Sequence, residues 1–395
     1  MIFGDGLTSK EYPIAKALMG LMVLNLALTF PNSVFDSITS SQEQFFFQKL
    51  LVVLQNLLNP FITLPLLIMG YGSVAMVCVT TFLTSSKLFL NIWYCRYKMQ
   101  TQFIFRDFDF GLLKEMWIFT FFIFINMIVD QINWSVDKFL LGRMAGTIAV
   151  AVYGVGGQLN SLYLQLSTAV SSVFVPEVNR IVAEIDDNDK LTKLFTKVGR
   201  IQFMILSLIL SGFVFLGKPF IQFWAGEEYS SSYRIALLLM IPVTIPLIQN
   251  LGIEIQRAKN MHKARSIVYF FIAISNLFIS IPCIRKWGAE GAAIGTALSL
   301  ALGNGLFMNW YYHKKIGLDI LYFWKQICKL APAYILPIIV GSIIFKYILI
   351  DDILEFAICV VFYTAVFCVS IYFCGINKDE KEIFNKVSKK ILRRY

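Results

Sequence analysis

The chain alternates between long apolar runs and short polar segments, and the length of the runs sets the first expectation. Eleven runs are each long enough to cross a bilayer as a helix, which takes about 20 residues. They cover roughly 14–34, 50–69, 73–94, 117–133, 147–175, 199–217, 232–252, 266–284, 291–311, 329–348 and 354–374. A helix satisfies its own backbone hydrogen bonds within lipid. The pattern therefore predicts an all-α polytopic membrane protein with about eleven transmembrane helices.

Composition supports the same class. Of the 395 residues, 57% are hydrophobic and only 15% are charged, and the mean hydropathy is +0.67. A soluble domain carries about 25% charged residues, so the apolar excess here has to face lipid. The net charge of +10 lies mostly in the segments between the runs. We therefore attribute it to membrane topology and anionic lipid, and we expect no nucleic-acid partner.

The distribution of Lys and Arg predicts the orientation of the chain. Alternate inter-run segments hold 23 of these residues in one set and 7 in the other. The richer set is expected to be cytoplasmic, and it includes the C-terminal tail 375–395. Eleven spans then place residues 1–13, which contain no signal peptide, on the opposite side. That arrangement suggests that an odd number of upstream helices is missing, or that the count is wrong by one.

Two of the basic segments have amphipathic spacing. In the tail, Phe384, Val387 and Ile391 recur among lysines and arginines. In 176–200, apolar residues alternate with charges in the same way. Packing of both segments on the membrane surface is the default interpretation, with a regulatory role as the alternative.

The run 147–175 carries an unusual polar face. Five polar residues recur at helical spacing: Gln158, Ser161, Gln165, Thr168 and Ser172. A polar stripe does not face lipid without cost. It either bonds to neighbouring helices or lines a wetted substrate path, and the sequence leaves both readings open.

Polar residues also cluster where the run 117–133 ends. Asp130, Gln131 and Asn133 lie near the end of the span, and Asp137 and Lys138 follow. An ionisable group at such a position is a candidate functional residue. The alternative is that the cluster is interfacial, with Asp137 and Lys138 pairing with each other or with neighbours.

The run 232–252 contains Pro242 and Pro246, followed by Gln249 and Asn250. Proline inside a helix frees backbone carbonyls and kinks the axis, and broken helices in transporters often mark a gating or binding element. A static kink is the plainer reading. In the basic segment after this run, Arg257 is a candidate phosphate ligand or a topology signal.

Other features point to packing rather than chemistry. Gly291, Gly295, Ser299 and Gly303 recur every four residues and predict close helix packing. None of the seven cysteines forms a CxxC pair. No nucleotide-binding or hydrolase motif occurs in a suitable context. We therefore expect no cofactor, no metal site and no enzymatic activity.

Several segments together resemble a known family. They are 130–142 (DQINWSVDKFLLG), 149–154 (AVAVYG), 223–226 (FWAG), 245–252 (IPLIQNLG) continuing into 257–262 (RAKNMH), and 288–296 (GAEGAAIGT). The likeness is to the polysaccharide and O-antigen repeat-unit flippases of the MATE-like (multidrug/oligosaccharidyl-lipid/polysaccharide) superfamily. It runs through most of the chain and rests on many weak positions.

The resemblance implies a fold and a domain plan. Members have two six-helix lobes around a central cavity, followed by two accessory helices. Residues 1–111 then look like a partial first lobe of three helices, 112–316 like the second lobe, and 317–395 like the accessory pair with a basic cytoplasmic tail. The first three helices of the family are apparently absent, which agrees with the orientation deduced from the basic residues.

The resemblance also implies a function. Such proteins flip undecaprenyl-pyrophosphate-linked oligosaccharides across the bacterial cytoplasmic membrane by alternating access, for O-antigen, capsule and other surface polysaccharides. The expected partners are membrane lipid, this substrate and other polysaccharide-assembly proteins. The alternatives are a cation-coupled drug or metabolite antiporter of the same superfamily, a membrane enzyme, and an inactive truncated protein or scaffold.

Overall fold

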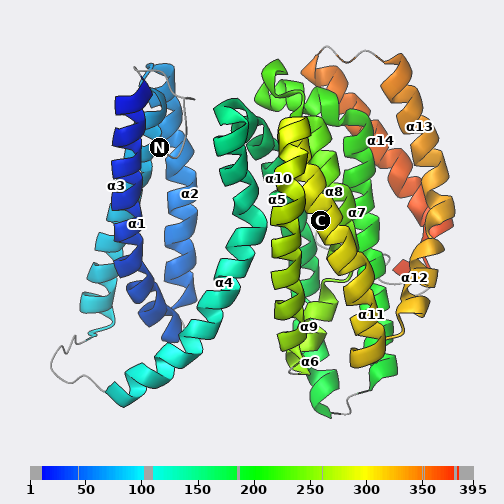
Figure 1. Ribbon diagram of the computed structural model, residues 1–395, viewed down its shortest axis with the longest axis horizontal. Coiled ribbons are helices and arrows are strands. Elements are labelled where there is room, and N and C mark those ends of the chain that lie inside the picture. Colours follow the sequence, from blue (N-terminus) through cyan, green and yellow to red (C-terminus); the bar gives the residue numbers. More distant parts are fainter. Residues whose placement is uncertain are drawn as a thin grey trace, which may run out of the picture. The chain divides into compact units, whose positions relative to one another are not determined.

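A computed structural model describes residues 11–42, 44–101, 110–184, 187–259, 261–348, 350, 352–377 and 380–381. Within these ranges every regular element is helical (Figure 1). The α-helices are α1 Glu11–Ser41, α2 Phe45–Ile68, α3 Gly72–Trp93, α4 Phe110–Met144, α5 Gly146–Ser172, α6 Val175–Glu184, α7 Asn188–Ala225, α8 Ser232–Ile248, α9 Leu251–Ala258, α10 His262–Leu300, α11 Asn309–Tyr311, α12 Ile320–Cys328, α13 Ile335–Tyr347 and α14 Ile353–Ser370. The all-α prediction is confirmed.

Each of the eleven predicted spans overlaps a helix, although 232–252 is divided between α8 and α9, and 266–284 and 291–311 both begin in α10. By length and apolarity, seven of the described helical segments can cross a membrane, or eight if α8 and α9 form one broken span. The segment Ile267–Ile316 counts once in that number, although it contains two predicted spans. The chain is thus a multi-pass membrane protein, while the exact number of eleven stays a prediction.

The chain divides into two compact units, with the boundary inside α4 between Ile118 and Phe119. In the smaller unit, α1 and α2 both pack on α3. Its large apolar side chains are mostly exposed, while Asn32, Thr39 and Asn91 are buried. Helices in lipid gain little from burying apolar groups, so small and polar residues make the interhelical contacts.

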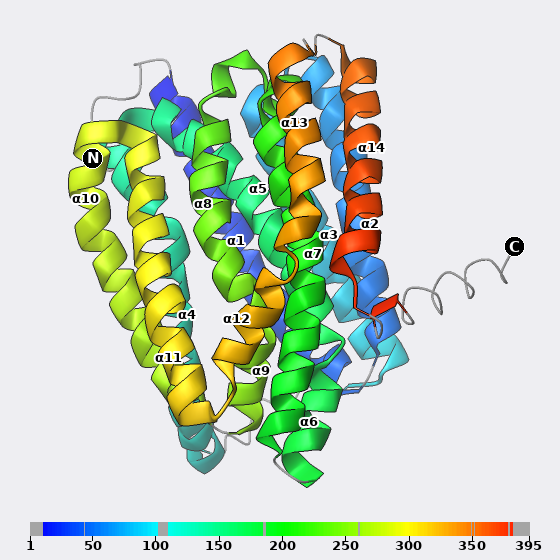
Figure 2. The same ribbon diagram turned by 90° about the vertical axis from the view of Figure 1, so that its right-hand side faces the viewer.

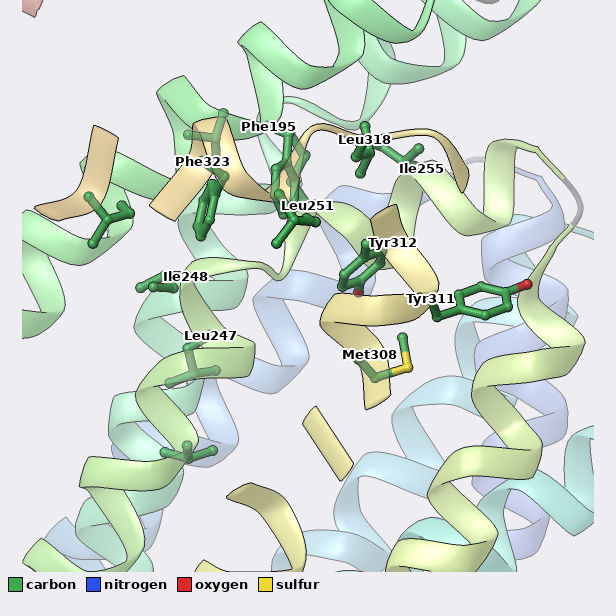
Figure 3. Packing of buried hydrophobic residues seen from close by; sticks show 14 of the residues in the cluster. Phe195, Leu247, Ile248, Leu251, Ile255, Met308, Tyr311, Tyr312, Leu318 and Phe323 are labelled. Carbon is green, nitrogen blue, oxygen red and sulfur yellow. The ribbon is translucent and has the colours of Figure 1, made fainter. Parts of the chain in front are cut away.

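In the larger unit, α8 packs against α5, α7 and α10, and α13 and α14 pack against α7 (Figures 1 and 2). The main buried cluster lies where α7, α9, α11 and α12 meet (Figure 3). The rings of Phe195 and Phe323 lie 4.8 Å apart, centroid to centroid. Gly199 allows this packing, because a Cβ there would lie 2.7 Å from the Ile248 carbonyl oxygen.

Helix α10 is two limbs joined at Gly288, whose φ of 55° interrupts the helical backbone. Figure 2 shows the two limbs side by side. The predicted glycine face lies between them: a Cβ at Gly295 would meet Ser280, and one at Gly303 would meet Ile272. The predicted packing role of these small residues is confirmed.

Two polar segments differ from their expected form. Of the basic segment 253–265, residues up to Ala258 belong to α9 and those from His262 onward to α10. In 176–200, Leu191, Leu194 and Val198 enter the core of the larger unit, because α7 extends well beyond the predicted span. The apolar face there packs on protein rather than on the membrane surface. Most of the predicted amphipathic tail lies outside the described residues.

Candidate functional site

The most unusual polar group of the larger unit is Asp137 on α4, which is only 2% exposed. Its Oδ2 accepts a hydrogen bond from the Tyr153 hydroxyl of α5 at 2.8 Å and another from the Thr296 hydroxyl of α10. Leu141, Val152 and Ile235 lie in the apolar cluster of the same region. One carboxylate is thus held by hydroxyl groups from two other helices inside an apolar region.

The hydrogen-bonded network continues between the two limbs of α10. The Ser280 hydroxyl donates to Asn276 Oδ1 at 2.8 Å, and the Thr296 hydroxyl lies 3.4 Å from the same oxygen. Asn276 and Ser280 come from the first limb and Thr296 from the second, so the glycine packing of the limbs brings these groups together.

This network leaves oxygen atoms unused. Among the described side chains, Asp137 makes no ion pair. Within the part of the chain that the structure describes, its Oδ1 and the Oδ1 of nearby Asn160 have no hydrogen-bond partner. A buried carboxylate without a cationic partner is costly unless it binds a proton or a cation. The arrangement is therefore suited to the reversible binding of a proton or a small cation.

A cavity of about 210 Å³ lies beside this network. Its lining includes Tyr153 and Thr296, the two residues that bond to Asp137, together with Lys138, Asn160 and Ser161. It is large enough for several water molecules, since one occupies about 30 Å³ of liquid. Of the predicted site residues, Lys138 and Ser161 meet here.

Asp137 and Lys138 do not form the ion pair considered from the sequence. Asp137 is buried, whereas Lys138 is exposed and has no ion pair among the described side chains. Successive residues of a helix point in different directions, so neighbours in sequence need not share a face. Gln131 is exposed and donates to Ser135 at 2.7 Å, while the side chains of Asp130 and Asn133 lie outside the described set.

The predicted polar face of α5 is exposed along its length. The five members are Gln158, Ser161, Gln165, Thr168 and Ser172. Their hydroxyl groups bond to carbonyls of α5 itself, as Ser161 does to Gly157 at 2.9 Å. Within the described residues, the hydroxyl groups of this face make no hydrogen bond to another helix. The wetted substrate path stays a prediction.

A neighbouring face of α5, missed in the sequence, provides the interhelical bonds. Ser167 donates to the Leu247 carbonyl at 2.8 Å and accepts from Gln202 at 3.1 Å. Tyr163 bonds to Thr244 at 2.8 Å. The available signal was the recurrence of Asn160, Ser167 and Ser171 at helical spacing in the same run.

The two prolines predicted to kink the helix lie in α8, shortly before α8 bends into α9. Pro242 and Pro246 are inside α8, and α8 meets α9 at an angle of 43°. Gln249 donates to Asn309 at 2.7 Å and Asn250 donates to Ser171 at 3.2 Å. The two amides thus fix the break to neighbouring helices.

Arg257, on α9, is exposed and pairs with Glu254 at 2.8 Å. The described contacts do not link it to Asp137, Lys138 or the polar face of α5. Its predicted role in binding phosphate stays a prediction.

The smaller unit contains a second charged cluster that the sequence reading missed. Lys87 of α3 pairs with Asp36 of α1 at 2.7 Å, and Asn91 donates to the other oxygen of Asp36 at 3.0 Å. Asn91 also bonds to Asn32 at 3.3 Å. A lysine inside the apolar run 73–94 was the available signal, because charged residues within spans are rare and usually paired.

These features define a multi-pass membrane protein with polar networks buried between its helices. The model of a family described as "Polysaccharide biosynthesis protein" matches residues 10–234. The chain belongs to this family.

Two relatives bear names of transport proteins. "Probable flippase AglR" of Haloferax volcanii is 22% identical over 174 residues, which are 44% of this chain and 36% of that protein. "Putative O-antigen transporter" of Shigella dysenteriae is 25% identical over 184 residues, 46% of this chain and 44% of the relative. The matched part thus spans less than half of each relative.

A solved structure shares the fold. "Lipid II flippase MurJ, inward closed conformation" superposes with a TM-score of 0.74 at 17% identity, over 93% of this chain and 76% of that one. The expected flippase fold is thereby confirmed.

Proposed function

We propose that this chain flips undecaprenyl-pyrophosphate-linked oligosaccharides across the bacterial cytoplasmic membrane for surface polysaccharide synthesis. The observation that carries the proposal is the combination of its family with a flippase fold and relatives named for flipping and O-antigen transport. The chain acts as a transporter rather than an enzyme. The basic segments and the C-terminus lie in the cytoplasm, and other polysaccharide-assembly proteins are its partners.

The proposed path uses the polar face of α5. The amide groups of Gln158 and Gln165 are exposed and contact sugar hydroxyls as the head group passes, while the polyprenyl tail stays in lipid. Each amide offers both donors and acceptors, which suits a ligand with many hydroxyl groups. Lys138 and Arg257 attract the pyrophosphate.

Alternating access then moves the substrate. The lobes change their inclination about the 43° bend between α8 and α9, which follows Pro242 and Pro246 along the chain. The hydrogen bonds of Gln249 and Asn250 hold the bend in the present state and are exchanged when the lobes move. The lobes follow the predicted domain plan of 1–111, 112–316 and 317–395.

Asp137 couples this motion to an ion gradient. Its neutral state, with a proton or a small cation bound, is compatible with burial among α4, α5 and α10. Its free charged state favours a looser packing that admits water. The difference between the two states links binding of the ion to helix movement.

The proposal is tested by deleting the gene that encodes the chain and analysing the cell-surface glycan and its lipid-linked precursor. Loss of the glycan, with precursor retained on the cytoplasmic face, is expected. Complementation should succeed with the wild type and fail with Gln158→Leu/Gln165→Leu. Unchanged glycan in a strain with no other flippase would contradict the proposal.

A further inference from the structure

A row of four cations follows one face of α7. Lys190, Lys193, Lys197 and Arg200 are spaced by three, four and three residues, which places them along the same side of the helix. They border a cavity of about 780 Å³ enclosed by α6, the first turns of α7, α12 and the chain around Asn377.

The innermost cation is already neutralised. Arg200 is 2% exposed and bonds to both carboxylate oxygens of Glu380, at 2.7 and 3.0 Å. It also donates to the carbonyls of Gly375, at 2.9 Å, and Gln326. Arg200 and Glu380 both line the cavity, so this ion pair forms part of its wall.

The outer cations are exposed and lack close carboxylate partners. Among the described side chains, Lys193 and Lys197 make no ion pair, and Lys190 only approaches Asp187 at 3.9 Å. The whole lining contains five basic and three acidic residues. Its positive charge is concentrated on the α7 wall, whereas α6 contributes Glu177 and Glu184 along with Arg180.

Neutral polar groups complete the lining. Thr196, Tyr322, Gln326 and Asn377 all border the cavity. Thr196 is buried, and its hydroxyl has no hydrogen-bond partner among the described residues. A ligand that accepts hydrogen bonds would satisfy such a group.

The position of the cavity along the helices indicates the membrane surface. α7 has 38 residues, so it is about 57 Å long and extends well beyond a hydrocarbon layer of about 30 Å. The turns before Gly199 precede the predicted span, on the basic side. α12 begins the candidate span Ile320–Tyr347, and Leu321 beside Tyr322 is 74% exposed. A positively charged cavity thus lies next to an apolar surface.

We propose that this cavity binds the head group of an anionic phospholipid of the phosphatidylglycerol class. The phosphodiester lies against Lys193 and Lys197, and the acyl chains leave past Leu321. Glu177 and Glu184 keep the phosphate on the α7 side and accept hydrogen bonds from the glycerol hydroxyls. The lipid joins α6 and α7 to α12, and so connects the second lobe to the accessory helices at the level of the Arg200–Glu380 ion pair.

The test is lipid binding to the full chain purified in detergent, measured by native mass spectrometry with dioleoyl phosphatidylglycerol and dioleoyl phosphatidylcholine. The variant Lys193→Gln/Lys197→Gln is compared with Lys314→Gln/Lys315→Gln, which removes two exposed lysines from another segment on the basic side. We expect the first variant to weaken phosphatidylglycerol binding by about 10-fold or more and the control by less than about 2-fold.

Three results would overturn the proposal. One is equal loss of binding in both variants, which would indicate a general charge effect. Another is equal affinity of the wild type for phosphatidylcholine. The third is displacement of the lipid by inorganic pyrophosphate at equal concentration, which would assign the cavity to a free phosphate. Failure of flipping leaves these measurements unaffected, because the binding is read without transport.

Discussion

Two carboxylates, Asp137 and Asp36, show how differently one residue type is used in the two units. Asp36 has a cation, Lys87, at 2.7 Å. Asp137 has hydroxyl partners, and its other oxygen has no partner within the described ranges. The Asp36–Lys87 pair holds α1 and α3 together. Burial of the unpaired Asp137 carboxylate costs free energy, and binding of a proton or a cation lowers that cost.

The variant Asp137→Asn should keep the fold but lose the coupling of transport to an ion gradient. The amide has nearly the same volume and removes the buried charge, so the unfolding temperature should stay equal or rise. Transport in vesicles should no longer respond to an imposed pH or sodium gradient. The matched control is Glu228→Gln, which changes an exposed carboxylate outside the network and should leave the response intact. A gradient response that survives in Asp137→Asn would refute the coupling role.

Lys87→Met should lower the free energy of unfolding by about 1–3 kcal/mol, because it leaves Asp36 without its cation in a partly buried site. Thermal unfolding in detergent measures the change. Lys16→Met, which removes an exposed lysine from α1, is the control.

The exchanged pair Asp36→Lys/Lys87→Asp should recover part of the loss, since the opposite charges again face each other. If the exchanged pair is no more stable than Lys87→Met, the two side chains do not stabilise the unit by pairing.

Among the helices, α10 shows how small residues bring distant polar groups together. Its two limbs approach closely at Gly291, Gly295 and Gly303, and this approach places Asn276, Ser280 and Thr296 around Asp137. The stripe was predicted from the sequence because its four-residue repeat is a local signal. The polar network was not predicted, because its members come from three helices and only tertiary packing brings them together.

Gly295→Ala should destabilise the larger unit by about 1–3 kcal/mol. The added Cβ would lie 2.8 Å from the Ser280 Cα, so the limbs must separate. Thermal unfolding measures the loss. Gly154→Ala on α5 is the control, because no atom lies within 4 Å of the Cβ built there. Equal stability of the two variants would mean that the limbs do not depend on this contact.

Across the whole molecule, the positions of the helices could be predicted from the sequence. Which polar residues are buried and which pair with each other could not. Each of the eleven apolar runs overlaps a helix, because membrane helices are encoded by local apolarity. The polar face of α5 could also be predicted, because its residues recur within one helix. Burial of Asp137, exposure of Lys138 and the Asp36–Lys87 pair depend on contacts distant in sequence. The position of a residue within a span, which the sequence does give, does not reveal its partners.

The proposed flipping path and the proposed lipid site both involve the larger unit. The polar face of α5 and the break between α8 and α9 belong to helices that pack on one another in the larger unit, and Asp137 is hydrogen-bonded to α5 and α10. The lipid site adds a contact between this lobe and α12. The proposed ion site and the proposed lipid site would then both act on the packing of the larger unit.

The most direct test is flipping by the purified chain in proteoliposomes. A fluorescent polyprenyl-diphosphate oligosaccharide is placed in both leaflets, and a membrane-impermeant quencher reports how much of it reaches the outer leaflet. The account predicts that quenching proceeds beyond the outer-leaflet half in vesicles with wild-type protein, and more slowly with Gln158→Leu/Gln165→Leu. Quenching that stops at the level of protein-free vesicles, with the protein shown to be folded, would contradict it.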